Sequence, residues 1–211
     1  NRCFSGLQIS PTCINPDSLG SFSFMNIIVL DRDGVINEDS DDYIKSPEEW
    51  SPVPGSLEAI AALHVDGYKV AVATNQSGLG RMLFDEIALA NIHQKMCSMV
   101  EDSGGFIEGV FYCPHLPDAG CGCRKPKTGL LQRIEDELLT SLTGQYFVGD
   151  SLKDLQAARA FSMQPVLVRT GKGRLTESRL YELEGEPVPV FDNLAQFVEI
   201  GLPRTISGNH V

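Results

Sequence analysis

A short apolar stretch that ends abruptly in two carboxylates constrains this chain more than any other feature. Residues 27–30 read Ile-Ile-Val-Leu, and Asp31, Arg32, Asp33 and Gly34 follow directly. A run of this length, rich in β-branched residues, predicts a buried strand. Ligands of open α/β sheets bind at the carboxyl ends of strands, and strand alternation places Asp31 and Asp33 on one side. Because adjacent carboxylates repel, the pattern indicates a bound cation, although taken alone it also fits a simple polar turn.

Length and charge narrow the classes of protein that fit. The 211 residues are enough for one domain of ordinary size with a substantial core. The formal net charge of -11 argues against nucleic acid or an anionic membrane as a partner, so an anionic substrate would need a local cluster of cations. No apolar run approaches the roughly 20 residues of a membrane span, and we expect no signal peptide. We expect a monomer that binds neither nucleic acid nor a membrane.

The chain divides into three expected parts. Residues 1–24 are rich in Ser, Pro, Asn and Gly without periodicity, which predicts a flexible extension, and Met25 would be a sensible natural start. Residues 25–202 form one predicted domain, and residues 203–211 a C-terminal tail. Strands are predicted near residues 27–30, 68–73, 109–112, 145–148, 165–169 and 188–191. Helices are predicted near residues 56–64, 84–102, 130–138, 152–161 and 194–198.

Strands that alternate with helices predict an α/β fold, a Rossmann-like parallel sheet with helices on both faces. No insertion is long enough to form a separate cap domain. In the helix near residues 84–102, His93 lies off the apolar stripe and is expected at the solvated surface. Cys97 is expected as a buried core thiol.

Polar residues follow the other predicted strands as well. Thr74, Asn75, Gln76 and Ser77 supply hydroxyl, amide and backbone N–H groups that suit a phosphate, although such turns are also common without a ligand. Further along, Arg124 and Lys125 supply positive charge, and Asp150 and Asp154 follow the fourth strand. The carboxyl ends of parallel strands meet at one edge, so these side chains should converge with Asp31 and Asp33.

The converging groups define a chemistry. Several carboxylates form an oxygen-rich site that fits Mg²⁺ best, while arginine and lysine bind a phosphate by a fork and a point charge. Together they suit phosphoryl transfer, in which one carboxylate attacks phosphorus and another exchanges a proton with the leaving oxygen and the attacking water.

In order and spacing, Asp31-Arg32-Asp33-Gly34, Thr74-Asn75-Gln76-Ser77, Lys125-Pro126 and Gly149-Asp150 resemble the four motifs of haloacid dehalogenase-type phosphatases. The resemblance covers roughly residues 25–173. It implies that Asp31 is the nucleophile and Asp33 the general acid/base, while Lys125 and Thr74, or the neighbouring Asn75, stabilise the phosphoryl group. It also implies that Mg²⁺ binds Asp31, the backbone carbonyl of Asp33, and Asp150. Asp154 would hold a metal-bound water or orient its loop.

One short segment carries four soft metal ligands: Cys113, His115, Cys121 and Cys123. Three cysteines and one histidine are typical of a closed, structural, tetrahedral Zn²⁺ site, and they indicate metal binding in a reducing cytosol rather than a disulfide framework. Incidental placement is the alternative. Zinc would rigidify this loop and hold Arg124 and Lys125 in place. Because metal-binding thiols of this kind indicate a reducing compartment, a cytoplasmic location is expected.

A zinc loop beside Lys-Pro resembles a narrow, capless branch of the superfamily that contains heptose bisphosphate and histidinol-phosphate phosphatases. Residues 39–50, 149–158 and 168–173 look closer to the heptose enzymes. This resemblance implies cleavage of the 7-phosphate of D-glycero-D-manno-heptose 1,7-bisphosphate, a step toward nucleotide-activated heptose for lipopolysaccharide-type surface glycans. Met82 departs from the glycine usual in that branch. The implied substrate contacts are Arg124 for the distal end of the sugar, together with Asp39, Tyr43, Asn75, Gln76, Ser77 and Lys125.

Two alternatives remain open from the sequence. Histidinol phosphate carries an amine, which the acidic residues Asp39, Asp41 and Asp42 would suit. A zinc-stabilised binding protein without catalysis belongs to a different class. Against it, Asp31 and Lys125 are both intact, and a non-catalytic protein has no physical need for the full set of buried charges.

Overall fold

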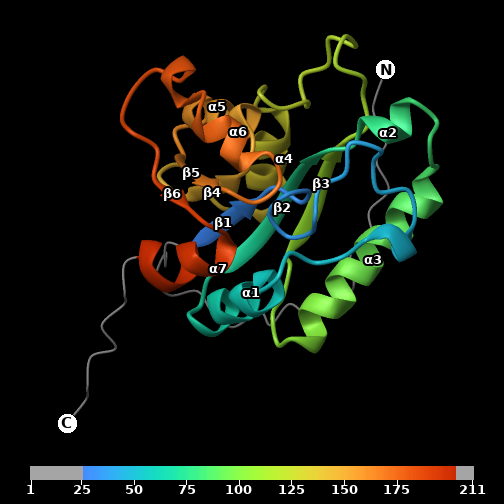
Figure 1. Ribbon diagram of the computed structural model, residues 1–211, viewed down its shortest axis with the longest axis horizontal. Helices are drawn as coiled ribbons and strands as arrows, with labels where there is room; N and C mark the ends of the chain where they lie inside the picture. The colour runs from blue at the N-terminus through green and yellow to red at the C-terminus, as the bar shows by residue number, and fades with distance from the viewer. Residues whose placement is uncertain (1–25, 203–211) are drawn as a thin grey trace.

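The computed structural model describes residues 26–202, so the predicted extension 1–24, the start at Met25 and the tail 203–211 lie outside the described residues. Within this range six parallel strands form a sheet in the order β3-β2-β1-β4-β5-β6. The strands are β1 (Ile27–Leu30), β2 (Lys69–Asn75), β3 (Gly109–Cys113), β4 (Tyr146–Gly149), β5 (Gln164–Val168) and β6 (Val190–Phe191). The predicted parallel α/β fold is confirmed (Figure 1).

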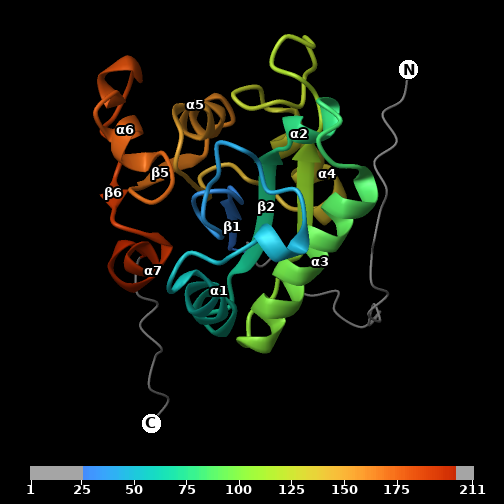
Figure 2. The ribbon, with the colours of Figure 1, turned by 45° about the vertical axis from the view of Figure 1, so that its right-hand side comes forward.

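Helices connect the strands and cover both faces of the sheet (Figure 2). They are α1 (Ser56–Val65), α2 (Ser77–Gly80), α3 (Glu86–Asp102), α4 (Gly129–Leu138), α5 (Leu152–Ala160), α6 (Gly173–Glu177) and α7 (Leu194–Gln196). One core cluster joins α1, α3 and α7 to one face of the sheet, and a second joins α4 and α5 to the other. A parallel strand needs such a crossover to return to the same edge.

β1 lies near the middle of the sheet because its sequence is apolar on both faces. All four of its residues, Ile27–Leu30, are fully buried. Ile28 and Leu30 belong to the cluster with α1 and α3, whereas Ile27 and Val29 belong to the cluster with α4 and α5. A continuous apolar run is what a strand covered on both faces requires.

β2 extends beyond the predicted residues 68–73 and includes Thr74 and Asn75. Its last residues pair with β3, in the register Thr74 to Tyr112 and Asn75 to Cys113. The ladder continues because β3 supplies backbone partners for these polar residues, which sequence propensity cannot anticipate.

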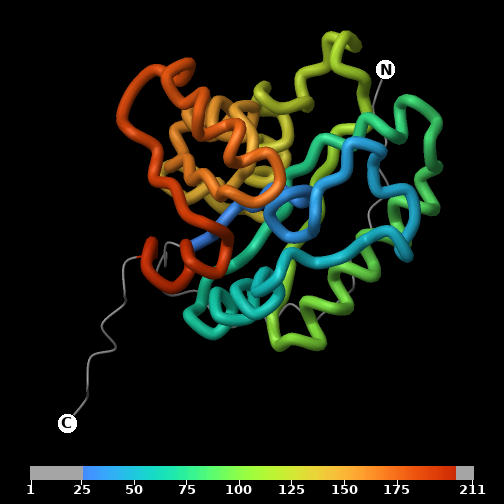
Figure 3. Tube along the Cα trace, in the orientation of Figure 1, coloured from blue at the N-terminus to red at the C-terminus, as the bar shows by residue number. Residues whose placement is uncertain are grey.

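The polar connection 37–54 is anchored rather than loose, as Figure 3 shows along the trace that precedes α1. Trp50 is only 1% exposed and packs in the core. The ammonium of Lys95 on α3 donates hydrogen bonds to the backbone carbonyls of Pro47 and Trp50, at 2.7 and 2.9 Å. The connection therefore has a fixed base from which its outer residues can reach the edge of the sheet.

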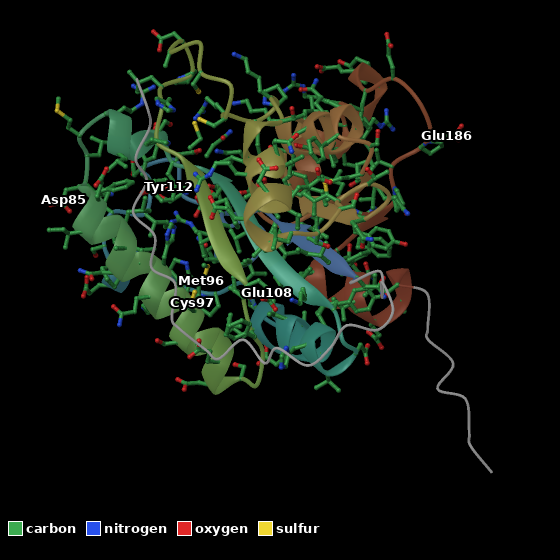
Figure 4. All side chains as sticks on the ribbon, turned by 180° about the vertical axis from the view of Figure 1, so that it is seen from behind. Asp85, Met96, Cys97, Glu108, Tyr112 and Glu186 are labelled. Atoms are coloured by element: carbon green, nitrogen blue, oxygen red, sulfur yellow. The ribbon has the colours of Figure 1, made fainter. Side chains whose placement is uncertain are left out.

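α3 packs against this face of the sheet through Leu89, Ile92, Met96 and Val100, all buried. Cys97, labelled beside Met96 in Figure 4, is partly buried against the same core, and burial raises the pKa of its thiol to about 11. None of the helices among residues 26–202 combines the length and apolar character needed to cross a membrane.

Candidate active site

The carboxyl ends of β1, β2 and β4 meet at one edge of the sheet, and each carries a predicted site residue. Asp31 follows β1, Thr74 lies near the end of β2, and Asp150 follows β4. The Asp31 backbone N–H donates to the Val148 carbonyl of β4 at 2.9 Å, so the carboxylate is fixed at its root to the neighbouring strand. The convergence predicted from the sequence is present in the structure.

Lys125 joins this group from the loop after β3. Its ammonium lies 2.9 Å from Asp31 Oδ2 and 2.6 Å from Asp154 Oδ1, and it donates to the Ala73 carbonyl at 2.7 Å. The side chain is only 2% exposed. Burial alone would lower the pKa of Lys125, but the carboxylates of Asp154 and Asp31 outweigh it and raise that pKa. Lys125 is therefore a permanent buried cation facing the nucleophile candidate.

Three carboxylates still exceed this one cation. Oxygens of Asp31, Asp150 and Asp154 all lie within 4.8 Å of one another. Burial, together with the neighbouring carboxylate of Asp154, raises the pKa of Asp31 to about 7 despite Lys125. Burial and the charges of Asp154 and Asp31 raise the pKa of Asp150 to about 8. A compact, oxygen-only cluster with excess negative charge fits a hard divalent cation.

Two glycines make room for Asp150. A side chain at Gly34 or at Gly171 would place its Cβ 2.2 or 2.3 Å from Asp150 Oδ2. Both glycines also have positive φ, at 80° and 54°. The same carboxylate accepts a hydrogen bond from the Lys172 backbone N–H at 2.8 Å. Gly34 and the segment after β5 thus form a backbone cradle around one acid, because only glycine permits this approach.

Asp33 faces a different set of partners. Arg32, fully buried, donates to it through Nε and Nη2 at 2.8–3.0 Å. Asn37 Nδ2 and Gln76 Nε2 donate at 2.9 and 2.8 Å. Burial alone would raise the pKa of Asp33, but the charge of Arg32 and these donors lower it below the ordinary value. The carboxylate is ionised and held on one side of the site.

The residues after β2 divide between two tasks. Gln76 Nε2 donates to Thr74 Oγ1 at 2.9 Å, so the Thr74 hydroxyl keeps its own proton to donate elsewhere. Asn75 exchanges hydrogen bonds with the backbone of Lys125, at 3.0 and 3.2 Å. Ser77 is buried at the start of α2. Of the two predicted phosphoryl contacts, Thr74 is therefore better placed, whereas Asn75 positions the loop that carries Lys125.

The predicted metal loop projects beyond the end of β3, as the yellow-green segment of Figure 1. The Cys113 sulfur lies 3.7 Å from that of Cys121 and 3.3 Å from that of Cys123. His115 Nδ1 lies 3.5 Å from the Cys113 sulfur and 3.2 Å from the Cys123 sulfur. Bonds of about 2.3 Å to a tetrahedral centre would separate sulfur ligands by about 3.8 Å. The four ligand atoms therefore surround one common point, as a zinc site requires.

The metal loop also orients positive charge. Arg124 Nη1 donates to the His115 carbonyl at 3.2 Å, and the Lys127 ammonium donates to the Cys121 carbonyl at 2.7 Å. Arg124, Lys125, Lys127 and Lys153 line one side pocket of about 200 Å³, and no carboxylate lines it. Because the net charge of the chain is -11, we expected that a local cluster of cations would be needed to attract an anionic substrate. These four side chains form such a cluster.

The connection 37–54 lies against two other loops of the site. Lys172 pairs with Asp39 at 3.1 Å and with Asp41 at 3.4 Å. The ring of Tyr43 lies over Gly78, where an added Cβ would approach it to 3.1 Å. Asp39 and Tyr43 are thus at the edge of the site, as predicted for substrate contacts, and the contacts themselves stay a prediction.

Sequence reasoning missed four residues of this site: Arg32, Asn37, His93 and Lys172. The prediction that His93 lies at the solvated surface is wrong, because its Nε2 lies 3.3 Å from Arg32 Nη1 and its ring contacts Tyr112. Burial, and then the charge of Arg32, lower the pKa of His93 to about 3. No local signal in the sequence could have found this contact, because Arg32 and His93 are 61 positions apart.

Comparison with known proteins places this site in a family. A heptose phosphatase of Pseudomonas aeruginosa, named D-glycero-beta-D-manno-heptose-1,7-bisphosphate 7-phosphatase, is 51% identical over 174 residues, which are 81% of this chain and 94% of that protein. The chain belongs to this phosphatase family. A protein of the same name from Neisseria meningitidis is 48% identical over 82% of this chain and 92% of its own. The HAD-hydrolase-like family model matches residues 122–197 of this family member.

Solved structures of the family agree with the fold. The D,D-heptose 1,7-bisphosphate phosphatase of B. bronchiseptica, complexed with magnesium and phosphate, has a TM-score of 0.78 at 47% identity and covers 83% of this chain and 97% of its own. Its Burkholderia thailandensis counterpart has a TM-score of 0.64 at 40% identity, over 82% and 96%. Membership in this family makes the chain a phosphoric monoester hydrolase.

Proposed function

We propose that this protein removes the 7-phosphate of D-glycero-β-D-manno-heptose 1,7-bisphosphate through a phosphorylated aspartate. The observation that carries the proposal is the pairing of Asp31 with the buried Lys125, at 2.9 Å, inside a cluster of carboxylates. The relatives named for this reaction match over most of their length, which supports the substrate and its β anomer.

In the proposed first step, Asp31 attacks phosphorus and the bond to the sugar oxygen breaks. The Asp31 carboxylate is held for this attack by the Arg32 backbone N–H, at 2.7 Å from Oδ1, and by Lys125 at Oδ2. Lys125 and the Thr74 hydroxyl stabilise the charge on the transferred phosphoryl oxygens. Asp33 gives a proton to the departing sugar oxygen.

In the second step, Asp33 takes the proton of a water that attacks the phosphorylated Asp31, and inorganic phosphate leaves. Asp33 must then turn between two environments. Its donors, Arg32, Asn37 and Gln76, hold the ionised form before the reaction. Substrate must weaken some of these bonds before Asp33 can carry a proton, so we expect Asp33 to reorient in the substrate complex.

Two metals are part of the proposal. The residues present fit Mg²⁺, which Asp31, Asp150 and the backbone carbonyl of Asp33 would hold, and the neighbour from B. bronchiseptica was solved with magnesium. Bound Mg²⁺ would supply charge neutralisation for the phosphoryl group and the attacking carboxylate. Cys113, His115, Cys121 and Cys123 fit a structural Zn²⁺, which would hold Arg124 toward the substrate.

Substrate selection in this proposal relies on the loops around the site. Arg124 recognises the end of the sugar that keeps its phosphate, and Asp39, Tyr43 and the backbone around Gln76 and Ser77 contact the sugar and the cleaved phosphate. The retained 1-phosphate product suits activation by a nucleotide for a bacterial surface glycan. We also maintain the predictions of a monomer and of a cytoplasmic location, and the free thiols of the metal loop support the location.

Histidinol phosphate is less well supported as a substrate. Of the three acidic residues that would suit its amine, Asp39 and Asp41 already pair with Lys172, which leaves Asp42. A binding protein without catalysis would have no reason to bury Lys125 against Asp31 and Asp154, because such burial costs free energy unless the charges are used.

The test is phosphate release with Mg²⁺ from both anomers of heptose 1,7-bisphosphate, from histidinol phosphate, from fructose 1,6-bisphosphate and from an aryl phosphate. We expect kcat/KM for the β-heptose substrate to exceed the others by about two decades or more, since selectivity comes from contacts away from the reacting phosphate. Asp31→Asn should abolish release while the fold, followed by circular dichroism, survives. Preference for histidinol phosphate would overturn the substrate, and an active Asp31→Asn would overturn the mechanism.

A further inference from the structure

A chain of contacts, fully buried at Arg32 and partly buried at His93, links α3 to the proposed general acid. Arg32, which is fully buried, donates hydrogen bonds from Nε and Nη2 to the carboxylate of Asp33. Its remaining nitrogen, Nη1, lies 3.3 Å from Nε2 of His93. His93 in turn stacks at a tilt on Tyr112 of β3, with ring centroids 5.8 Å apart, and Tyr112 is labelled beside α3 in Figure 4. The contacts run from the core side of α3 to the edge where phosphate is proposed to react.

The chemistry of the two groups fixes the direction of this hydrogen bond. A guanidinium has only N–H donors, so Arg32 Nη1 must donate and His93 Nε2 must accept. The acceptor nitrogen carries no proton, which makes His93 neutral with its proton on Nδ1. A protonated His93 would instead bring a second cation against Arg32 in a buried place. The pKa of His93, lowered to about 3, agrees with the neutral form.

Without this acceptor the guanidinium would be held only on one edge. The fork to Asp33 uses Nε and Nη2, and rotation about the Arg32 side chain would move both donors together. His93 fixes the opposite corner of the same planar group, so the plane of the fork is defined by two contacts on different elements. Asn37 and Gln76 then complete the set of donors around the Asp33 carboxylate.

We propose that His93 is a positioning residue for the phosphatase reaction, acting through Arg32 on the orientation of Asp33. This inference rests on the proposed function, because it assigns His93 to the proton transfer in that reaction. His93 does not touch the substrate or the reacting atoms. Its contribution is to keep the Arg32 fork aligned, so that Asp33 is presented to the departing sugar oxygen in one orientation.

The test separates proton transfer from general damage by means of the leaving group. A sugar alkoxide is strongly basic and needs a proton as it leaves, whereas p-nitrophenolate is weakly basic and leaves without one. The quantity kcat/KM covers the steps up to transfer of the phosphoryl group to Asp31, which include departure of the leaving group. A defect in positioning Asp33 should therefore reduce kcat/KM for the sugar phosphate and spare p-nitrophenyl phosphate.

Two variants of similar size make the comparison. His93→Leu removes the acceptor, while His93→Gln places an amide oxygen near the position of Nε2. For His93→Leu we expect kcat/KM on heptose 1,7-bisphosphate to fall by about 10- to 100-fold and on p-nitrophenyl phosphate by less than about threefold. His93→Gln should recover most of the loss. Gln94→Ala, an exposed position on the same helix, is the control and should match wild type.

The outcomes distinguish failure of the role of His93 from failure of the proposed phosphatase function. Equal losses on both substrates, or full activity of His93→Leu, would overturn the role of His93 and leave the proposed function standing. A wild-type enzyme that hydrolyses neither substrate would overturn the proposed function itself and this inference with it. If His93→Leu fails to fold, a crystal structure of His93→Gln decides: an Arg32 fork displaced from Asp33 together with unchanged kcat/KM on both substrates contradicts the proposal.

Discussion

The ammonium of Lys125 lies 2.9 Å from a carboxylate oxygen of Asp31, and both groups are buried where three strand ends meet. Lys125 lies two residues after Cys123, the last cysteine of the metal loop, and the Asn75 side chain fixes its backbone by two hydrogen bonds. The pair is thus assembled from segments of β1, β2 and the loop after β3. A buried ion pair of this kind makes a weak contribution to stability by itself, so its value must be sought in the reaction.

Replacement of Lys125 by Met should lower both activity and stability. The change leaves Asp154, which is fully buried, and Asp31 without their cation. We expect a loss of about 3 kcal/mol in unfolding free energy and at least about a 1000-fold loss in kcat. Because Mg²⁺ would replace the missing positive charge, it should raise the melting temperature of the variant more than that of wild type. Thermal unfolding with and without Mg²⁺ checks this, and equal shifts would contradict it.

The stability of the protein without Mg²⁺ should fall as pH rises from about 5 to about 8. Burial raises the pKa of Asp31 to about 7 and that of Asp150 to about 8, so between pH 4 and these values the folded state binds more protons than the unfolded state. Stability present at the acid end is therefore lost as pH rises through the folded pKa values. Two groups oppose this fall: Asp33, whose pKa is lowered, does so below its ordinary pKa, and His93, whose pKa is lowered from 6.5 to about 3, does so at pH values below 6.5. One histidine offsets only one of the two acids, so the net change is still a loss of stability.

Saturating Mg²⁺ should flatten this dependence, since it binds the ionised carboxylates. Urea unfolding of zinc-loaded protein across this pH range, with and without Mg²⁺, makes the measurement. A chelator should be avoided in the Mg²⁺-free series, because it would also remove zinc. A rise of stability toward pH 8 without Mg²⁺ would refute the assignment of raised pKa values.

Cys121→Ala should lower the melting temperature and raise KM together. The Cys121 sulfur is one of the four candidate ligand atoms, and the Cys121 backbone carbonyl accepts a hydrogen bond from Lys127. Loss of the metal would therefore free the segment that holds Arg124. We expect a shift of about 5 °C or more and a several-fold rise in KM, with a smaller change in kcat. Cys97→Ala, on α3 and outside the cluster, is the matched control. An unchanged melting temperature in Cys121→Ala would contradict a structural metal.

Met82→Gly should stabilise the protein. Met82 has φ of 57° and is 89% exposed, so its side chain buries little surface yet holds the backbone in the left-handed region. Relief of this strain is worth about 1 kcal/mol. Met82→Ala removes the side chain but keeps the strain, so it should leave stability nearly unchanged. Urea unfolding of the pair makes the comparison, and equal stabilities would show that the backbone there is not strained.

This position also explains a departure seen in the sequence. The resemblance noted in the sequence implies glycine at the position of Met82, and the backbone here has the left-handed conformation that glycine prefers. The turn is maintained by hydrogen bonds from Met82 N to the Leu79 carbonyl and from Leu83 N to the Gly78 carbonyl. The turn therefore accommodates methionine at a position suited to glycine, at a local cost.

Much of the fold could be predicted from the sequence, because period and apolar runs report burial directly. The strands appear within one or two residues of the predicted positions, and the predicted acids at the ends of β1 and β4 converge. The end of β2 was predicted too early, since the continuation through Asn75 depends on pairing with β3. Pairing of this kind is tertiary and leaves no mark in one strand alone.

The site was predicted less completely than the fold. The candidate metal ligands and phosphate-binding residues could be predicted because carboxylates, cysteines and lysine indicate their chemistry by residue type alone. The contacts of Arg32 with His93, and of Lys172 with Asp39, join residues 61 and 133 positions apart, and no local pattern reports them. His93 was misplaced because a helical stripe counts apolar residues, whereas this histidine is polar by type and yet partly buried against Arg32.

The full burial of β1 has a consequence for how the molecule moves. Ile27–Leu30 is hydrogen-bonded to strands on both sides and shielded by helices on both faces, so its amides can exchange with solvent only when the whole domain opens. The exposed outer part of the connection 37–54 has no such protection. Amide exchange should therefore be slowest immediately before Asp31 and fast around Asp41. The proposed nucleophile thus follows a strand that opens only with the domain, while the outer part of the connection proposed to contact the sugar is free to adjust.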